Sequence, residues 1–260
     1  MSKTKTAIVT GSTSGIGEGI AKAFAAQGIG IVLNGFGDKD AIETLRREIA
    51  EKFKVKVTYS GADMSKPAEI KKMVDDAVAD HGSVDILVNN AGIQFTALVE
   101  DFPDEKWDQI IAINLSAAFH ASKHAIPYMK KNKWGRIINI ASAHGLVGSP
   151  QKVAYVAAKH GIVGMSKVIA LEYANDGITS NSICPGWVLT PLVEKQLQDR
   201  AKENGTTVDQ EKVKLVAEKQ ALHQFTTPEQ IGGLALFLIS DAAATITGAT
   251  QSIDGGWTAE

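Results

Sequence analysis

Short β-branched runs alternate with longer amphipathic stretches along this chain, and no other feature limits its fold as strongly. The alternation predicts parallel strands joined by right-handed helical crossovers, because each helix must return the chain to the same edge of the sheet. We predict an α/β fold: a single Rossmann-like doubly wound parallel sheet of about seven strands, with helices on both faces. The expected strands cover residues 7–10, 30–33, 55–59, 86–88, 136–140, 179–184 and 250–253, and the expected helices cover residues 15–27, 39–52, 67–81, 104–131, 153–175 and 228–240.

A charged segment from Glu194 to Lys219 interrupts this alternation before the last helix. It contains two helical stretches separated by Asn204-Gly205-Thr206-Thr207. We predict one domain over residues 1–260, in which an insertion at about 188–220 forms a helical lid over a substrate site. A solvated surface excursion is the alternative, since long insertions cost little loop entropy.

Composition excludes several classes of protein. The net charge is -2 with a pI of about 6.3, and no basic run is interleaved with aromatic residues, so we expect no nucleic-acid partner. The single cysteine, Cys184, fits a reducing compartment, and no apolar stretch reaches the ~18 residues of a membrane span. The chain enters the apolar run Ala7-Ile8-Val9 too early to leave room for a signal peptide. We predict a cytoplasmic protein without a membrane partner.

The stretch from Val153 is apolar or small on nearly every side of its helix, as Ala154, Ala158, Ile162 and Met165 illustrate. One buried stripe needs fewer such residues. The pattern therefore predicts a second packing partner, which we expect to be another subunit.

A glycine-rich turn, Gly11-Ser12-Thr13-Ser14-Gly15-Ile16-Gly17, follows the first expected strand and opens the first helix. Glycine allows the backbone to approach a pyrophosphate closely, and the helix N-terminus adds a partial positive charge. In this position the turn predicts a dinucleotide site.

Tyr155 and Lys159 are four residues apart, a spacing that places a phenol beside an ammonium on one helix face. A nearby positive charge favours the phenolate and lowers the pKa of tyrosine from its usual value near ~10. The pair can then act as a base near neutral pH. Taken alone, it also fits an ordinary surface helix.

With the glycine turn, Asn89-Asn90-Ala91-Gly92 and Tyr155-x-x-x-Lys159, the chain resembles the short-chain dehydrogenase/reductase family over nearly its whole length. The resemblance implies four catalytic residues. Ser142 would bond the substrate oxygen, Tyr155 would exchange its proton, Lys159 would hold the cofactor ribose and acidify the phenol, and Asn114 would anchor a water in a proton relay. The dinucleotide contacts that it implies are Gly11, Thr13, Ser14, Gly15, Ile16, Gly17, Asn34, Phe36, Asp63, Met64, Asn90, Ala91, Gly92, Tyr155, Lys159, Pro185, Gly186, Val188 and Thr190.

The residues at the end of the second expected strand indicate whether the cofactor is NAD or NADP. They are Val32-Leu33-Asn34-Gly35-Phe36-Gly37. This stretch lacks the carboxylate that many NAD-dependent relatives use, but Thr13 and Gly35 also stand where NADP-dependent relatives often have a cation. Asn34 and Phe36 can bond and cover a ribose without charge for a phosphate. We predict NAD, with Lys39 as the one nearby cation against it.

Polar and aromatic side chains are expected around the catalytic residues. Lys152 lies three residues before Tyr155, so its ammonium can reach the same site. Amide donors, an imidazole and an ammonium would bind a carboxylate, while an indole limits the length of the acid. A solvated cation at a helix start is the alternative for Lys152, and a loop hydrogen bond is the alternative for His144. The substrate residues predicted in this way are Gln94, Ser142, His144, Lys152, Tyr155, Trp187 and Gln196.

The stretches 90–94, 142–147, 184–188, 191–196 and 254–257 resemble the family of bacterial D-3-hydroxybutyrate dehydrogenases. The resemblance implies that Gln94, His144, Lys152 and Gln196 hold the carboxylate of the acid. It also implies that Trp187 and Trp257 line the pocket for its methyl group. It also implies a homotetramer that oxidises D-3-hydroxybutyrate reversibly to acetoacetate with NAD.

Two alternatives remain open from the sequence. One is an NADPH-dependent reductase of a larger ketone or 3-ketoacyl thioester, and the other is a non-catalytic dinucleotide-binding regulatory protein. No His, Asp or Glu cluster has ligand spacing, so we expect no catalytic metal.

Overall fold

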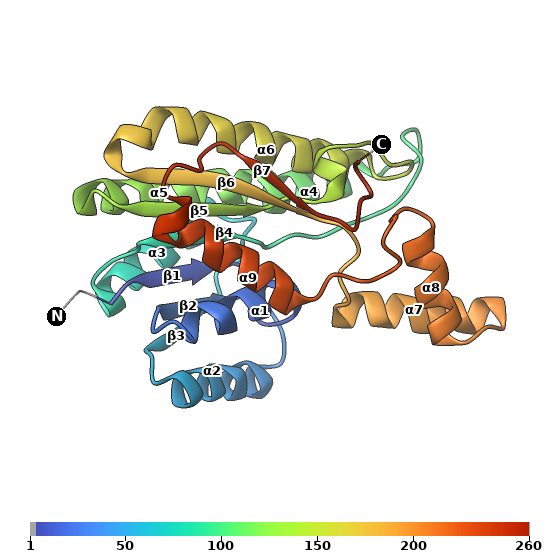
Figure 1. Cartoon of the computed structure of the whole chain (residues 1–260), viewed down its shortest axis with the longest axis horizontal. Helices are drawn as coiled ribbons and strands as arrows, with labels where there is room; N and C mark the ends of the chain where they lie inside the picture. The colour runs from blue at the N-terminus through green and yellow to red at the C-terminus, as the bar shows by residue number, and fades with distance from the viewer. Residues whose placement is uncertain (1–3, 260) are drawn as a thin grey trace.

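The computed structural model describes residues 4–259 apart from the side chain of Leu192, so both ends of the predicted 1–260 domain lie outside it. Its sheet has seven parallel strands in the order β3-β2-β1-β4-β5-β6-β7 (Figure 1). The predicted doubly wound fold is confirmed. The strands are β1 (Thr6–Val9), β2 (Gly30–Asn34), β3 (Val57–Ser60), β4 (Ile86–Asn89), β5 (Gly135–Ile140), β6 (Ile178–Pro185) and β7 (Thr250–Ile253).

Helices cover both faces of the sheet because its strands are apolar on both sides. Ala7, Val9 and Ile31 pack toward one face, whereas Ile8 and Val32 pack toward the other. The first face carries α1 (Gly15–Ala25), α2 (Lys39–Phe53) and α9 (Pro228–Ile239). The second carries α3 (Pro67–His81), α5 (Ala117–Asn132) and α6 (Val153–Tyr173).

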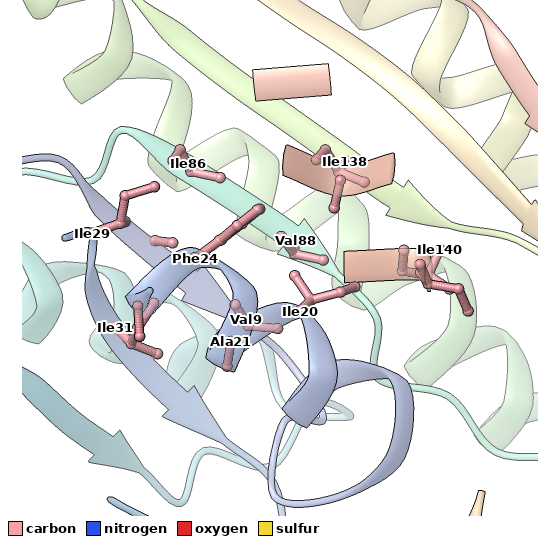
Figure 2. Packing of buried hydrophobic residues seen from close by; sticks show 14 of the residues in the cluster. Val9, Ile20, Ala21, Phe24, Ile29, Ile31, Ile86, Val88, Ile138 and Ile140 are labelled. Atoms are coloured by element: carbon pink, nitrogen blue, oxygen red, sulfur yellow. The ribbon is translucent and has the colours of Figure 1, made fainter. Parts of the chain in front are cut away.

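The core of the first face joins α1 to the middle of the sheet. Figure 2 shows Ile20, Ala21 and Phe24 of α1 directed toward Val9 and Val88 on neighbouring strands. Phe24 is fully buried. This packing fixes the first turn of α1 against the carboxyl ends of β1 and β4, where the strand order reverses and where sheets of this kind bind ligands.

The single helix expected over residues 104–131 is interrupted. It consists of α4 (Asp104–Ile111), a π turn (Ala112–Ser116) and α5. A π turn inserts one extra residue into a helix, and such turns are frequent at functional sites. Here the insertion directs Asn114 inward, where it is buried.

Two further helices, α7 (Pro191–Asn204) and α8 (Val208–Ala217), lie between β6 and α9 in the segment predicted as a lid. Figure 1 shows them side by side, away from the sheet. Thr190 caps α7, Gly205 ends it with φ of +62°, and Thr207 caps α8. No helix between residues 4 and 259 has both the length and the apolar character to cross a membrane.

Candidate active site

A cavity of about 290 Å³ opens at the carboxyl ends of the central strands. The end of β4, the end of β5, the start of α6, the turn after β6 and the first turns of α7 all contribute to it. The structure brings together all eight predicted substrate residues in this one cavity, although they are spread from position 94 to position 257. They are Gln94, Ser142, His144, Lys152, Tyr155, Trp187, Gln196 and Trp257.

Three of the four predicted catalytic residues also line the cavity: Ser142, Tyr155 and Lys159. Tyr155 and Lys159 lie on the first turns of α6, and Ser142 follows β5. The Lys159 ammonium donates to the carbonyl oxygen of Ile140 at 2.7 Å and lies 5.5 Å from the centre of the Tyr155 ring. The strand end therefore holds the lysine in place beneath the phenol.

Burial changes the electrostatics expected for this pair. It raises the pKa of Tyr155, and only a hydrogen bond with Ser142 opposes the increase. Burial also lowers the pKa of Lys159 to about 8. Lys159 is not among the causes of the Tyr155 shift, so the expectation that Lys159 and a bound oxidised cofactor acidify the phenol stays a prediction.

Asn114 lies apart from the main cavity. Its Oδ1 accepts from the backbone N–H of Ile93 at 2.9 Å, and its Nδ2 donates to the carbonyl of Ile93, also at 2.9 Å. It borders a hollow of about 10 Å³ that also touches Met64 and Ala91, which is roughly the room that one water needs. Its side chain thus holds the loop that carries Gln94, and its amide retains one N–H and one lone pair that these two bonds do not use. The relay water on Asn114 stays a prediction.

The glycine turn has the shape of a phosphate cradle. Gly11 and Gly15 have φ of +62° and +59°, and a Cβ on Gly17 would lie 2.4 Å from the carbonyl oxygen of Gly11. The Ser14 side chain does not cap α1, so the first N–H groups of the helix stay open to an anion. Asn90 supports the turn by donating to the carbonyl oxygens of Thr10 and Gly11 at 2.8 and 2.9 Å. These features fit the pyrophosphate of a dinucleotide.

The predicted ribose contact of Asn34 is corrected by the structure. Asn34 is buried, its Oδ1 accepts from the N–H of Gly11 at 3.2 Å, and its Nδ2 donates to the carbonyls of Ser60 and Ala62 at 3.1 and 3.0 Å. All its amide atoms are used within the protein. Asn34 therefore ties the ends of β2 and β3 to the glycine turn and presents no group to a ribose.

The remaining adenosine-side residues surround the same strand ends. Phe36 is 69% exposed, and its carbonyl accepts from the Thr13 hydroxyl at 3.1 Å. Met64 is buried. Hydrogen bonds from Ser65 lower the pKa of Asp63, so this carboxylate is charged at neutral pH. Ile16, Asn90, Gly92, Pro185, Gly186, Val188 and Thr190 reach the main cavity itself.

The far end of the cavity is positively charged. Burial lowers the pKa of His144 to about 4, with the cations of Lys152 and Lys219 adding to the effect, so the imidazole is neutral at pH 7. Burial and Lys219 also lower the pKa of Lys152. No Asp or Glu is among the described residues that line the cavity. An anion would therefore meet ammonium charge, two amides and a neutral imidazole without a competing carboxylate.

The residue before Lys152 links two loops of the cavity. The preceding residue, Gln151, has φ of +64°, a conformation that costs a non-glycine residue about 1 kcal/mol or more. Its carbonyl accepts from the N–H of Ala97 at 3.0 Å. This bond joins the loop of Lys152 to the loop of Gln94.

Aromatic rings form a wall of the cavity in contact with these polar groups. The ring centres of Trp187 and Trp257 are 5.9 Å apart, and Trp257 meets the His144 ring edge to face at 5.0 Å. His144 in turn lies 6.0 Å from the Tyr155 ring. The Lys152 ammonium is 5.7 Å from the centre of the Trp187 ring. The cavity therefore places two indole rings next to its ammonium group and its imidazole.

Sequence reasoning missed two residues that act on this site. Lys219 affects both His144 and Lys152 through its charge, and Gln220 holds the backbone of Trp187. Both follow α8, 23 and 24 residues beyond the predicted site residue Gln196, and no local pattern marks them. Among residues 4–259, no group of three His, Cys, Asp or Glu side chains is arranged to hold a metal.

Comparison with known proteins agrees with the fold and with the motifs. A family model described as enoyl-(acyl carrier protein) reductase matches residues 11–258. The chain is 60% identical to D-beta-hydroxybutyrate dehydrogenase of Cupriavidus necator, covering 98% of both chains. It is 56% identical to D-beta-hydroxybutyrate dehydrogenase of Rhizobium meliloti, covering 99% of this chain and 100% of that one. Among solved structures, L-sorbose reductase of Gluconobacter frateurii, complexed with NADPH and L-sorbose, superposes with a TM-score of 0.95 at 31% identity, covering 99% and 98% of the two chains.

The chain belongs to the short-chain dehydrogenase/reductase family and has the Rossmann-like fold of its oxidoreductases. The two bacterial relatives extend this likeness over nearly the full length of both chains, including every segment that lines the cavity.

Proposed function

We propose that this protein is a D-3-hydroxybutyrate dehydrogenase that oxidises its substrate reversibly to acetoacetate with NAD. The observation that carries the proposal is the single cavity in which a serine, a tyrosine and a lysine lie beside a cationic, carboxylate-free end and a short aromatic wall. The two dehydrogenases that share 60% and 56% of its residues support the choice of substrate.

Proton transfer in this proposal belongs to Tyr155. The Tyr155 phenolate takes the proton of the substrate alcohol and becomes a neutral phenol, while Ser142 holds the same substrate oxygen in line. Lys159, anchored on Ile140, supplies positive charge beneath the phenol. When bound, NAD⁺ would supply the hydride acceptor and a positive charge that offsets the desolvation of the phenolate. In the reverse direction, neutral Tyr155 protonates the forming alkoxide.

Substrate orientation follows from the charge distribution. The carboxylate pairs with Lys152 and accepts hydrogen bonds from Gln94, Gln196 and neutral His144, as charge-assisted bonds favour. The methyl group then points to Trp187 and Trp257. This arrangement presents one face of the secondary alcohol to Tyr155, and we assign that face to the D enantiomer.

The preference for NAD rests on the end of β2. Phe36 and Gly35 carry no charge, and Thr13 is engaged with the carbonyl of Phe36. A 2′-phosphate would therefore be desolvated without a cation to balance it. Lys39 starts α2 and is exposed, where screening weakens its pull. NADPH accompanies the sorbose reductase, so the cofactor needs its own test.

Three further features complete the proposal. The helices α7 and α8 act as a lid that closes over the acid, as mobile segments often do in enzymes. The chain assembles as a homotetramer, since α5 and α6 leave a hollow of about 800 Å³ with apolar residues along it. The single buried Cys184 suits a reducing, cytoplasmic setting.

The decisive experiment is a spectrophotometric assay that crosses both enantiomers of 3-hydroxybutyrate with NAD and NADP. We expect reduction of NAD with the D enantiomer and a much lower rate for the other combinations. The control substrate is 2-butanol, which keeps the secondary alcohol and lacks the carboxylate. A larger kcat/KM for 2-butanol, or for NADP, would contradict the corresponding part of the proposal.

A further inference from the structure

The segment after α8, residues 220–226, is hydrogen-bonded to the turns that carry Trp187 and Trp257 of the cavity. The N–H of Thr226 donates to the carbonyl of Trp187 at 2.9 Å, and the N–H of Leu189 donates to the carbonyl of Thr226 at 3.2 Å. The N–H of Leu222 donates to the carbonyl of Gly255 at 2.8 Å, two residues before Trp257. We call residues 220–226 the clasp, because they join the lid to both turns.

Gln220 is the centre of the clasp. Its side chain is 2% exposed, and its amide makes three hydrogen bonds to the backbone. Oε1 accepts from the N–H of Trp187 at 2.7 Å, while Nε2 donates to the carbonyls of Gln224 at 2.7 Å and Leu222 at 3.3 Å. One amide therefore holds the turn of Trp187 and closes the clasp on itself.

The same amide is packed tightly against the backbone of both turns. A Cβ on Gly186 would lie 2.7 Å from Oε1 of Gln220, and a Cβ on Gly255 would lie 2.8 Å from its Nε2. Gly255 also has φ of +62°, which side chains rarely adopt. The two turns can approach each other only because glycines flank the amide on each side.

We propose that Gln220 is a positioning residue that sets the length of acid the enzyme accepts. It does not line the cavity, but it fixes the turns from which Trp187 and Trp257 form the wall, with ring centres 5.9 Å apart. The inference rests on the proposed function, since that function places the methyl end of the acid against this wall.

The physical reason is the loss of a buried, fully bonded amide. Methionine has the length of glutamine but neither accepts from Trp187 nor donates to the clasp, so the buried N–H and carbonyl groups lose their partners. The turn of Trp187 can then shift, so that the space beside the Trp187 and Trp257 rings admits an acid that is one methylene longer. One methylene changes kcat/KM by roughly tenfold or more when a pocket is rigid, and this discrimination is what Gln220 preserves.

The test compares kcat/KM for 3-hydroxypentanoate with kcat/KM for 3-hydroxybutyrate. In Gln220→Met we expect this ratio to rise by roughly fivefold or more, with KM for 3-hydroxybutyrate increasing more than kcat falls. Gln230→Met is the matched control, because Gln230 Oε1 also accepts a backbone N–H, that of Thr227 at 2.9 Å, on α9. Its ratio should equal that of the wild type.

An unchanged ratio in Gln220→Met, or an equal loss for both acids, overturns the inference and leaves Gln220 a purely structural residue. If Gln220→Met does not fold, Gln220→Glu decides: it keeps an acceptor for Trp187 and places an oxygen against the carbonyls of Leu222 and Gln224, so the ratio should still rise. Wild type without activity on either acid defeats the proposed function, whereas an active wild type with unchanged variant ratios defeats this inference alone.

Discussion

At the scale of single residues, the site depends on which groups are kept neutral. His144 lies between the Tyr155 and Trp257 rings, and burial lowers its pKa to about 4. A neutral imidazole can donate one hydrogen bond to a carboxylate without adding to the charge of Lys152. The positive charge of the pocket is therefore concentrated on ammonium groups, and the hydrogen bond from His144 orients the carboxylate.

This pKa shift predicts how stability depends on pH. The unfolded chain protonates the imidazole near pH ~6.5, but the folded chain does so only near 4, so the unfolded state binds more protons between these values. The stability is fully present above the upper value and falls as the pH decreases. By pH ~5 the cost is about 2 kcal/mol. We expect His144→Gln to remove this cost, so that its Tm falls less than that of wild type between neutral pH and pH ~5, by roughly 4 to 8 °C.

Differential scanning calorimetry at both pH values measures the difference. His160→Gln is the control, because His160 lies exposed on α6 with its ring bonded to the carbonyl of Val156. This variant should follow the wild-type curve. Parallel curves for His144→Gln and wild type would show that burial does not hold the imidazole neutral.

At the scale of elements, one buried carboxylate links the two helices of the proposed lid. Glu211 of α8 is fully buried; it accepts from the Thr206 hydroxyl at 2.7 Å and pairs with Arg200 of α7 at 3.5 Å and with Lys214 at 3.2 Å. The hydrogen bond from Thr206 is the largest cause that lowers its pKa. The two helices also bury four apolar side chains, those of Leu197, Ala201, Leu215 and Val216, and the ion pair of Glu211 with Arg200 adds to this contact.

Replacing this carboxylate should loosen the lid without disturbing the dinucleotide cradle. We expect Glu211→Gln to raise KM for the acid by roughly fivefold, the upper range for a partly exposed charge pair, and to leave the Kd of NAD unchanged. Initial rates and fluorescence titration measure the two quantities. Glu218→Gln is the control, because its exposed carboxylate pairs with the same Arg200 at 3.4 Å. Equal effects of both changes, or a weaker NAD affinity, would argue against a lid held by Glu211.

Elements were predictable from sequence wherever local pattern and tertiary packing agree. Periodicity located all seven strands, and most ends differ by one or two residues. β3 begins two residues late because Lys54 adopts φ of +56° where no glycine marks the turn. The π turn was missed, since residues 112–116 have an ordinary helical pattern. Asn34 was misassigned because its partners, Ser60 and Ala62, come together with it only in the folded sheet.

At the scale of the whole molecule, α6 links the active site to the outer surface. One side of this helix carries Tyr155 and Lys159, and its buried residues pack on the sheet. Its outer side exposes Val168 and Leu171, the latter by 84%. The hollow between α5 and α6 includes Phe119 and Val168 among its lining residues. Exposed apolar surface is typical of interfaces between proteins, and a second copy of the chain is the partner that the proposed tetramer would supply.

The oligomer can be tested by placing a charge on this surface. We expect Leu171→Asp to reduce the mass measured by size-exclusion chromatography with light scattering from about four chains of 27.6 kDa to a smaller assembly, because an interface would desolvate the new carboxylate without a partner. Val213→Asp is the matched control, since Val213 is a β-branched apolar residue, 62% exposed on α8 and outside the hollow. It should keep the wild-type mass. A monomeric wild type, or an unchanged mass for Leu171→Asp, would mean that this side of α6 faces solvent, and the apolar character of the helix would then need another partner.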